Sequence, residues 1–332
     1  MRNKLCALLG LVVFLAALSV SGQDADTIKV DTRLVSVPVI VSDRNGRYVP
    51  NLTAADFTVF QDDAKQSIEF FAATEEPLTI ALLIDTSQST RPVLGDIKDS
   101  AKSFIKLLTP KDRAMVVTFD YETHILSGLT SDQKLLEKAV KSAEIPDRMF
   151  GTTMRDAVYQ TVAQSFRGLT GRKAIILLTD GKDAGSRIDQ GDLLYRLEES
   201  DTLIYTIMFK TGDGQRQAPR IFGGGGGRRR GVMFPMPRNN PKRNGRVERN
   251  NEMAEEFLQE LSETTAGRFY SSKDGKLKKT FATIVDELRF QYRIGFYPPE
   301  ETAGTTSHTL KVKISKPDAV VRSRSGYRTT TK

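Results

Sequence analysis

The sequence predicts a doubly wound α/β fold with a mostly parallel sheet, to which the two ends of the chain add a small β-sandwich-like domain. Continuous apolar runs at 79–84 and 173–179 are typical of strands that a parallel sheet buries on both faces. Segments with apolar residues at helical spacing follow these runs, as in βαβ units. At both ends of the chain, apolar and polar residues instead alternate with a period of two, which is typical of strands with one solvated face.

The α/β part is predicted to extend over residues 78–288. Its strands and helices alternate, as parallel strands joined by helical crossovers require. The expected strands are 79–84, 114–119, 123–126, 173–179, 203–208 and 267–270, and the expected helices are 97–108, 131–142, 154–165, 193–199, 252–263 and 277–288.

The two β-rich ends are residues 27–75 and 290–332. Alternating stretches at 33–41, 57–60, 292–297 and 309–314 mark strands within them. Neither end is long enough to form a comfortable sheet core alone. The sequence therefore predicts that the C-terminal segment pairs with the N-terminal one in a discontinuous domain.

Residues 211–250 interrupt the alternation of strand and helix. They contain five consecutive glycines at 223–227, three arginines at 228–230 and four prolines, with no periodicity. Ten of these residues are basic and two are acidic, so this segment accounts for the whole net charge of +8. We expect a flexible Gly/Arg-rich insertion. Its charge favours contact with an anionic envelope surface, and a merely tolerated insertion is the alternative.

The first residues have the composition of a secretory leader. Arg2 and Lys4 precede an uncharged, mainly apolar run at 5–23, and small residues occur at 20–22. This pattern predicts a signal peptide at 1–22, with an uncleaved membrane anchor as the alternative. In both cases we expect a chain that is secreted, periplasmic or associated with the cell envelope. Export leaves no role for nucleic acid as a partner, although Gly/Arg stretches can bind RNA.

The composition excludes several kinds of site. The chain of 332 residues has two histidines and one cysteine, Cys6, which lies in the predicted leader. A zinc site built from cysteine and histidine needs about four ligands, which the mature chain does not contain. A disulfide framework and a cysteine nucleophile are excluded for the same reason.

Five oxygen-bearing side chains are candidates for a metal site. They lie in three segments at or near the carboxyl ends of predicted strands, where doubly wound folds bind their ligands. Hydroxyl and carboxylate oxygens suit Mg²⁺, Mn²⁺ or Ca²⁺ better than zinc or copper. In an extended turn, alternate residues such as 85, 87 and 89 point the same way. The candidate ligands are Asp85, Ser87, Ser89, Thr152 and Asp180.

These residues also carry a resemblance. The pattern Asp-x-Ser-x-Ser from Asp85, a threonine after Gly151, and an aspartate within Thr-Asp-Gly resemble the metal-ion-dependent adhesion site of von Willebrand factor type A domains. The resemblance covers residues 78–288, with 211–250 as an addition. Thr153 competes with Thr152 for the second motif, and the Asp-Ala that ends the run 151–157 aligns with the family pattern and favours Thr152. The whole layout is also similar to exported bacterial proteins that contain such a domain.

The resemblance implies a binding protein rather than an enzyme. An Asp or Glu of a partner protein would complete the metal's coordination, as in cell adhesion by this family. A structural envelope protein with a vestigial metal site is one alternative. A metal-dependent hydrolase is another, and it would need Asp183, Glu122 or His124 as a general base. The partner and the oligomeric state stay open.

Overall fold

The computed structural model describes most of the chain beyond its first 33 residues. The predicted leader at 1–22 and most of the predicted insertion, residues 212–240, lie outside the described residues. In the part of the chain that is described, no helix combines the length and the apolar composition needed to cross a membrane. The described residues are 34–44, 46–73, 76–147, 151–211, 241–272, 277–299 and 304–331, with only the backbone described for 241–247, 304–305 and 330–331.

Six strands form the central sheet, which is parallel except for β7 at one edge. The chain passes from β5 to β6 on one side and later returns to β8 on the other side of β5. Strands β5 and β8 therefore flank the topological switch point of the sheet. This arrangement confirms the predicted doubly wound fold. Across the sheet the strands are β10 (Phe269–Ser271), β9 (Leu203–Met208), β8 (Arg172–Thr179), β5 (Leu78–Asp85), β6 (Arg113–Phe119) and β7 (Thr123–Thr130).

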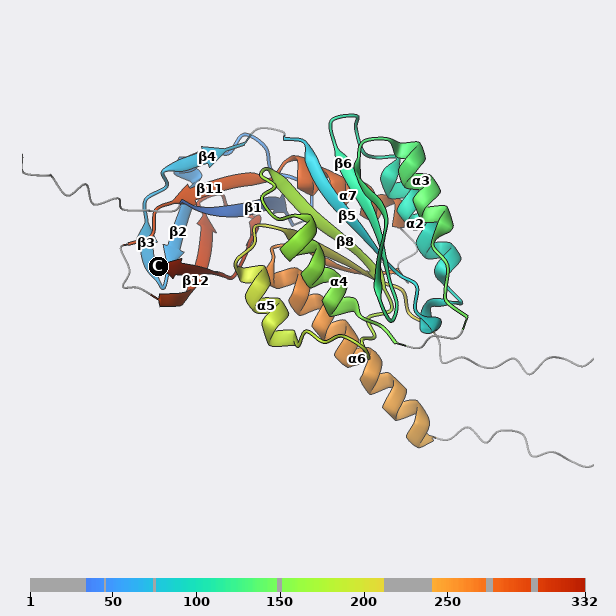
Figure 1. The fold of residues 1–332 in the computed structure, drawn as a ribbon. Helices are drawn as coiled ribbons and strands as arrows, with labels where there is room; N and C mark the ends of the chain where they lie inside the picture. Colours follow the sequence, from blue (N-terminus) through green and yellow to red (C-terminus); the bar gives the residue numbers. More distant parts are fainter. Residues whose placement is uncertain are drawn as a thin grey trace, which may run out of the picture. The chain divides into compact units, whose positions relative to one another are not determined.

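Helices cover both faces of this sheet (Figure 1). Ile80 and Leu82 of β5 contribute to the core on one face, and Ala81 and Leu83 to the core on the other. A strand between two such cores has no solvated side, which explains its continuous apolar run. Helices α2 (Leu94–Ile105), α3 (Gln133–Ser142) and α7 (Leu277–Arg289) pack on the first face, and α4 (Met154–Gln160), α5 (Gln190–Glu198) and α6 (Pro241–Thr264) on the second.

Helix α6 begins at Pro241, so the prediction that it starts at Glu252 is wrong. Proline suits the first helical position, because the N–H that it lacks would have no partner within the helix. Residues 241–250 include a single apolar side chain other than proline, Val247. No helical repeat of apolar residues therefore marks this part of the helix in the sequence.

Two four-stranded antiparallel sheets pack on a shared apolar core and form the predicted β-sandwich-like addition. In the first sheet, β1 pairs with β11 and with β13. In the second, β12 pairs with β2 and with β14. Each sheet thus combines strands from both ends of the chain. The strands are β13 (Ala319–Ser323), β1 (Val35–Asp43), β11 (Tyr292–Phe296) and β4 (Phe70–Ala72) in the first sheet, and β14 (Gly326–Thr331), β12 (Gly304–Ile314), β2 (Phe57–Gln61) and β3 (Ala64–Gln66) in the second.

Buried polar contacts join the sandwich to the α/β part. Arg322 on β13 lies 2.7 Å from the carboxylate of Glu287 on α7, whose side chain is 4% exposed. The buried Tyr205 on β9 donates a hydrogen bond of 3.0 Å to the same carboxylate. Arg172 at the start of β8 donates to the carbonyls of Leu288 and Gln291, at the passage from α7 to β11. The α/β part is therefore held to the sandwich where the chain returns to it.

An ion pair in the sandwich predicts a loss of stability in acid. The Asp62 carboxylate lies 2.6 Å from Nδ1 of His308 and accepts a 2.9 Å hydrogen bond from the Thr309 N–H. The hydrogen bond with His308, followed by that with Thr309, lowers the pKa of Asp62 to about 2. A carboxyl group that is more acidic when folded stabilises the protein above its unfolded pKa, and this contribution disappears as the pH falls from about 4 to about 2.

We therefore expect the urea midpoint of the wild-type protein to fall between pH 4 and pH 2 by more than that of Asp62→Asn. Asparagine is the matched replacement because residue 62 has a positive φ of 48°, which asparagine tolerates. Identical pH profiles for the two proteins would exclude a contribution from this ion pair.

Candidate metal centre

The first candidate ligand, Asp85, is the last residue of β5 and is fully buried. One carboxylate oxygen accepts a hydrogen bond from the Ser87 N–H at 2.9 Å, and the other accepts from the Thr179 hydroxyl at 2.6 Å. Burial, followed by the negative charge of Asp180, raises the pKa of Asp85 to about 7. A second negative charge therefore lies close to a carboxyl group that is already removed from water.

The two serines of the first motif lie together in the turn after β5. Their hydroxyl oxygens are 3.1 Å apart, so Ser87 and Ser89 lie side by side, although Ser89 belongs to a 3-10 helix at Gln88–Thr90 and not to the extended turn expected from the sequence. Ser87 is 3% exposed, whereas Ser89 is half-buried. Thr90 donates to the carbonyls of Asp85 and Ser87, which holds the turn in this shape.

Asp180 follows β8 and is 1% exposed. Its Oδ2 accepts hydrogen bonds from the Lys182 ammonium at 2.7 Å and from the Thr211 hydroxyl at 2.9 Å. Lys182 also donates to the Thr211 hydroxyl at 2.8 Å. Lys182 and Thr211 were not among the residues predicted from the sequence. The signal for Lys182 was its position two residues after the aspartate of Thr-Asp-Gly, whereas nothing in the sequence indicated Thr211.

Thr152 lies in the loop before α4, which is hydrogen-bonded to the loops on either side. The Thr152 carbonyl accepts from the N–H of Ala184 and of Gly185, in the loop after β8. On the other side, the Asp120 carboxylate accepts a hydrogen bond from the Thr86 hydroxyl at 3.0 Å. The Asp120 carbonyl accepts one from the hydroxyl of Thr153, in the loop before α4. The loop that carries Thr152 is thus fixed between the segments of Asp85 and Asp180.

Thr152 and Thr153 are both buried, but their hydroxyl groups differ. Both the N–H and the hydroxyl of Thr153 donate to the Asp120 carbonyl, at 2.7 Å and 3.0 Å. Among the described residues, the Thr152 hydroxyl has no hydrogen-bond partner. The geometry therefore leaves the Thr152 oxygen available, as the alignment of the run 151–157 favours.

The three side chains considered as a general base are placed differently. Asp183 accepts hydrogen bonds from the backbone N–H and Nε of Arg155 and from the Ser186 hydroxyl. His124 is 41% exposed, and its Nε2 lies 3.7 Å from the Asp120 carboxylate. Glu122 is in the β6–β7 turn, where its N–H contacts Asp120. The Asp183 carboxylate is thus already hydrogen-bonded to Arg155 and Ser186.

The donor set fits a hard divalent cation. Two buried carboxylates and neighbouring hydroxyls offer oxygen alone, which suits Mg²⁺, Mn²⁺ or Ca²⁺. Within the described ranges, no three His, Cys, Asp or Glu side chains gather in a metal-binding arrangement. A centre among the described residues would therefore depend on hydroxyl ligands beside its two carboxylates.

Comparisons with known proteins agree with the fold. Residues 79–236 match the family model of the von Willebrand factor type A domain. No curated protein sequence matches the chain significantly.

Solved structures similar to this chain come from several sources. BatB from Bacteroides thetaiotaomicron is 17% identical over 64% of this chain and 98% of its own, with a TM-score of 0.44. The vWF domain of the type V pili tip protein Mfa5 from Porphyromonas gingivalis is 13% identical over 69% and 99%, with a TM-score of 0.42. Proximal thread matrix protein 1 from the mussel byssus, with a zinc occupied MIDAS motif, is 17% identical over 69% and 49%, with a TM-score of 0.47.

The strand order, the helices on both faces of the sheet and the matching family model together identify a von Willebrand factor type A domain in this chain.

Proposed function

We propose that this chain is an exported, metal-dependent protein-binding or adhesion module. A divalent cation at the switch point of the sheet would supply a Lewis-acidic position that an Asp or Glu of a partner protein completes. Export follows from the composition of residues 1–22. The proposed ligands are Asp85, Ser87, Ser89, Thr152 and Asp180.

The observation that carries the proposal is the pairing of two buried carboxylates. Asp85 ends β5 and Asp180 directly follows β8, the adjacent parallel strand, and the two residues are 0% and 1% exposed. Two like charges in a site without water destabilise the fold unless a proton or a cation compensates them. The Lys182 ammonium compensates Asp180 only, since its contact is with that carboxylate. The site therefore favours a further positive charge.

The hydroxyl groups define how a cation would be held. Ser87 and Ser89 present adjacent oxygens, and the Thr152 hydroxyl is not committed to another group among the described residues. These three ligands are neutral, so the two carboxylates supply all of the negative charge. Mg²⁺ fits this small set because it usually keeps water molecules in its shell, and Mn²⁺ and Ca²⁺ are the alternatives.

Two other functions remain to be distinguished from binding. A metal-dependent hydrolase needs a general base, and its candidate Asp183 is engaged by Arg155 and Ser186. A structural envelope protein with a vestigial site would keep the fold without affinity for a cation. The basic residues of 211–250 would add contact with an anionic envelope surface in either case.

Calorimetric titration of the full chain with Mg²⁺, Mn²⁺ and Ca²⁺ tests the proposal. We expect saturable binding of one cation, which Asp180→Asn abolishes because it removes a charged ligand. The matched control is Asp99→Asn, an exposed position on α2 that makes an ion pair with Lys102 at 3.0 Å. Heat signals that are absent from the wild-type protein, or that persist unchanged in Asp180→Asn, would rule the proposed site out.

A further inference from the structure

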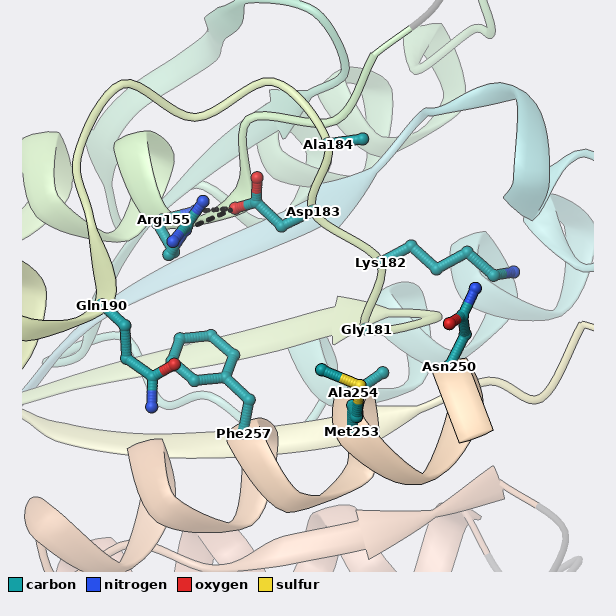
Figure 2. A pocket seen from close by; sticks show the side chains of 10 residues that line it. All are labelled: Arg155, Gly181, Lys182, Asp183, Ala184, Gln190, Asn250, Met253, Ala254 and Phe257. Atoms are coloured by element: carbon teal, nitrogen blue, oxygen red, sulfur yellow. Dashed lines mark hydrogen bonds and ion pairs between the residues drawn. The ribbon is translucent and has the colours of Figure 1, made fainter. Parts of the chain in front are cut away.

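A pocket of about 450 Å³ lies beside the proposed metal site. Figure 2 shows that α6 contributes Met253, Ala254 and Phe257 to one side and that the loop after β8 forms the other. Its volume lies in the range of ordinary ligand sites.

The pocket and the metal site share the loop after β8. Gly181 and Lys182 line the pocket and follow Asp180 directly. Gly181 has a φ of +80°, and a Cβ atom there would lie 3.0 Å from side-chain atoms of Ala254 and Leu258 on α6. This glycine therefore lets α6 pack directly against the loop that carries Asp180. A ligand bound to a cation at Asp180 would begin within reach of the pocket.

The charged side chains around the pocket already have partners. Arg155 makes an ion pair with Asp183 at 3.2 Å, as the dashed lines in Figure 2 show, and Lys182 makes one with Asp180 at 2.7 Å. The apolar side is accessible, since Met253 is 67% exposed and Phe257 is half-buried. An exposed methionine is adaptable and contacts apolar groups of different shapes. The pocket thus suits an uncharged, apolar side chain.

The end of the pocket next to Asp180 has the opposite preference. The carboxylates of Asp85 and Asp180 together balance one divalent cation, so the Lys182 ammonium adds a positive charge that these two carboxylates do not balance. This charge favours an acidic group on the bound partner. A position that favours an acidic group of the partner and one that favours an apolar group are therefore adjacent on the same surface.

We infer that the partner is a polypeptide in which an Asp or Glu lies one or two positions from an apolar residue. The carboxylate binds at the metal site, and the apolar side chain enters the pocket between α6 and the loop after β8. This inference rests on the proposed function and adds to it the sequence class of the partner.

Selection from a phage-displayed library of short random peptides tests this inference about the partner. The full chain is immobilised in Mg²⁺, and bound phage are eluted with a chelator. We expect the selected peptides to combine an acidic residue with a neighbouring apolar one. The same selection on Met253→Gln, which keeps the side-chain length but removes its apolar character, should retain the acidic residue and lose the apolar preference.

The affinity of a selected peptide gives the second readout. Met253→Gln should weaken its binding about tenfold, the change expected from losing part of a buried apolar contact. Glu256→Gln, an exposed change on the same helix outside the pocket, should leave the affinity unchanged. Calorimetric titration with Mg²⁺ should give the same cation affinity for both variants.

The outcomes separate the two proposals. Peptides with an acidic residue but no apolar preference, bound equally by wild type and Met253→Gln, would overturn the inference and leave the proposed function standing. A selection without any chelator-sensitive peptide would overturn both. Apolar peptides that bind equally well in a chelator would also overturn the inference, because the pocket would then act without the metal site.

Discussion

In a chelator, the free energy of unfolding of this protein is expected to decrease by roughly 4 kcal/mol as the pH rises from about 4 to about 7. The cause is Asp85, whose pKa is raised from 3.8 to about 7 by burial and by the charge of Asp180. A difference of one unit between the folded and unfolded pKa corresponds to about 1.4 kcal/mol. Because the folded state binds the proton more tightly than the unfolded state, each step up in pH within this window favours unfolding.

The variant Asp85→Asn isolates this effect. Asparagine is neutral at every pH and similar in shape, so the decrease in stability between pH 4 and pH 7 should disappear. At pH 8 without a cation, the variant should be more stable than the wild-type protein by a few kcal/mol. Urea unfolding across this pH range measures the difference, with Asp99→Asn as the control that should follow the wild type.

Cation binding should increase the free energy of unfolding of the wild-type protein at high pH. Saturating Mg²⁺ should restore the stability of the wild-type protein at pH 8 and leave Asp85→Asn unaffected, since a ligand stabilises only the state that binds it. A wild-type protein whose stability in chelator does not change between pH 4 and pH 7 would contradict the assignment of Asp85 as a buried, uncompensated carboxylate.

The second large effect is expected from Gly267→Ala, which should lower the free energy of unfolding by more than about 3 kcal/mol. Gly267 lies between α6 and β10, and a Cβ atom at this position would overlap the carbonyl oxygen of Ile204 on β9. The backbone cannot move aside freely. The Gly267 N–H donates to the Ser262 carbonyl, and the Gly267 carbonyl accepts from Arg322.

The control is the same substitution at Gly95, in the first turn of α2. A Cβ atom there would meet nothing within 4 Å. Since alanine is favoured over glycine in helices, Gly95→Ala should stabilise the protein by about 0.5–1 kcal/mol. Chemical denaturation of both variants gives the comparison. A Gly267→Ala protein within about 1 kcal/mol of the wild type would mean that the close approach to Ile204 relaxes easily.

The sequence could predict what depends on local pattern. Buried strands such as β5 and β8 are marked by uninterrupted apolar residues, and the doubly wound order follows from their alternation with helices. The proximity of Asp85 and Asp180 follows from the same logic, because the carboxyl ends of strands at a switch point meet at one edge of the sheet. The position of Lys182 two residues after Asp180 was a signal for their contact, but nothing in the sequence indicated Thr211, whose hydrogen bonds join the loop after β8 to the segment after β9.

Other features escaped prediction because they depend on contacts far apart in the chain. Strands β13 and β14 lack a long alternating pattern, and they form because β1 and β12 offer open edges for pairing. Among the α6 residues that line the pocket, Met253, Ala254 and Phe257 lie within the helix predicted from Glu252, and only Asn250 lies before it. The pocket itself could not be foreseen, because it forms where this helix meets the loop after β8, which is far away in the sequence.

The shared sandwich has a mechanical consequence. Strand β1 begins at Val35 and β14 ends at Thr331, so both ends of the described chain belong to the same small pair of sheets. The α/β part is inserted between β4 and β11, which pair with each other. Tension applied between the two ends would be carried first through the sandwich. A cation held between β5 and β8 would bear none of this tension until the two sheets of the sandwich separated.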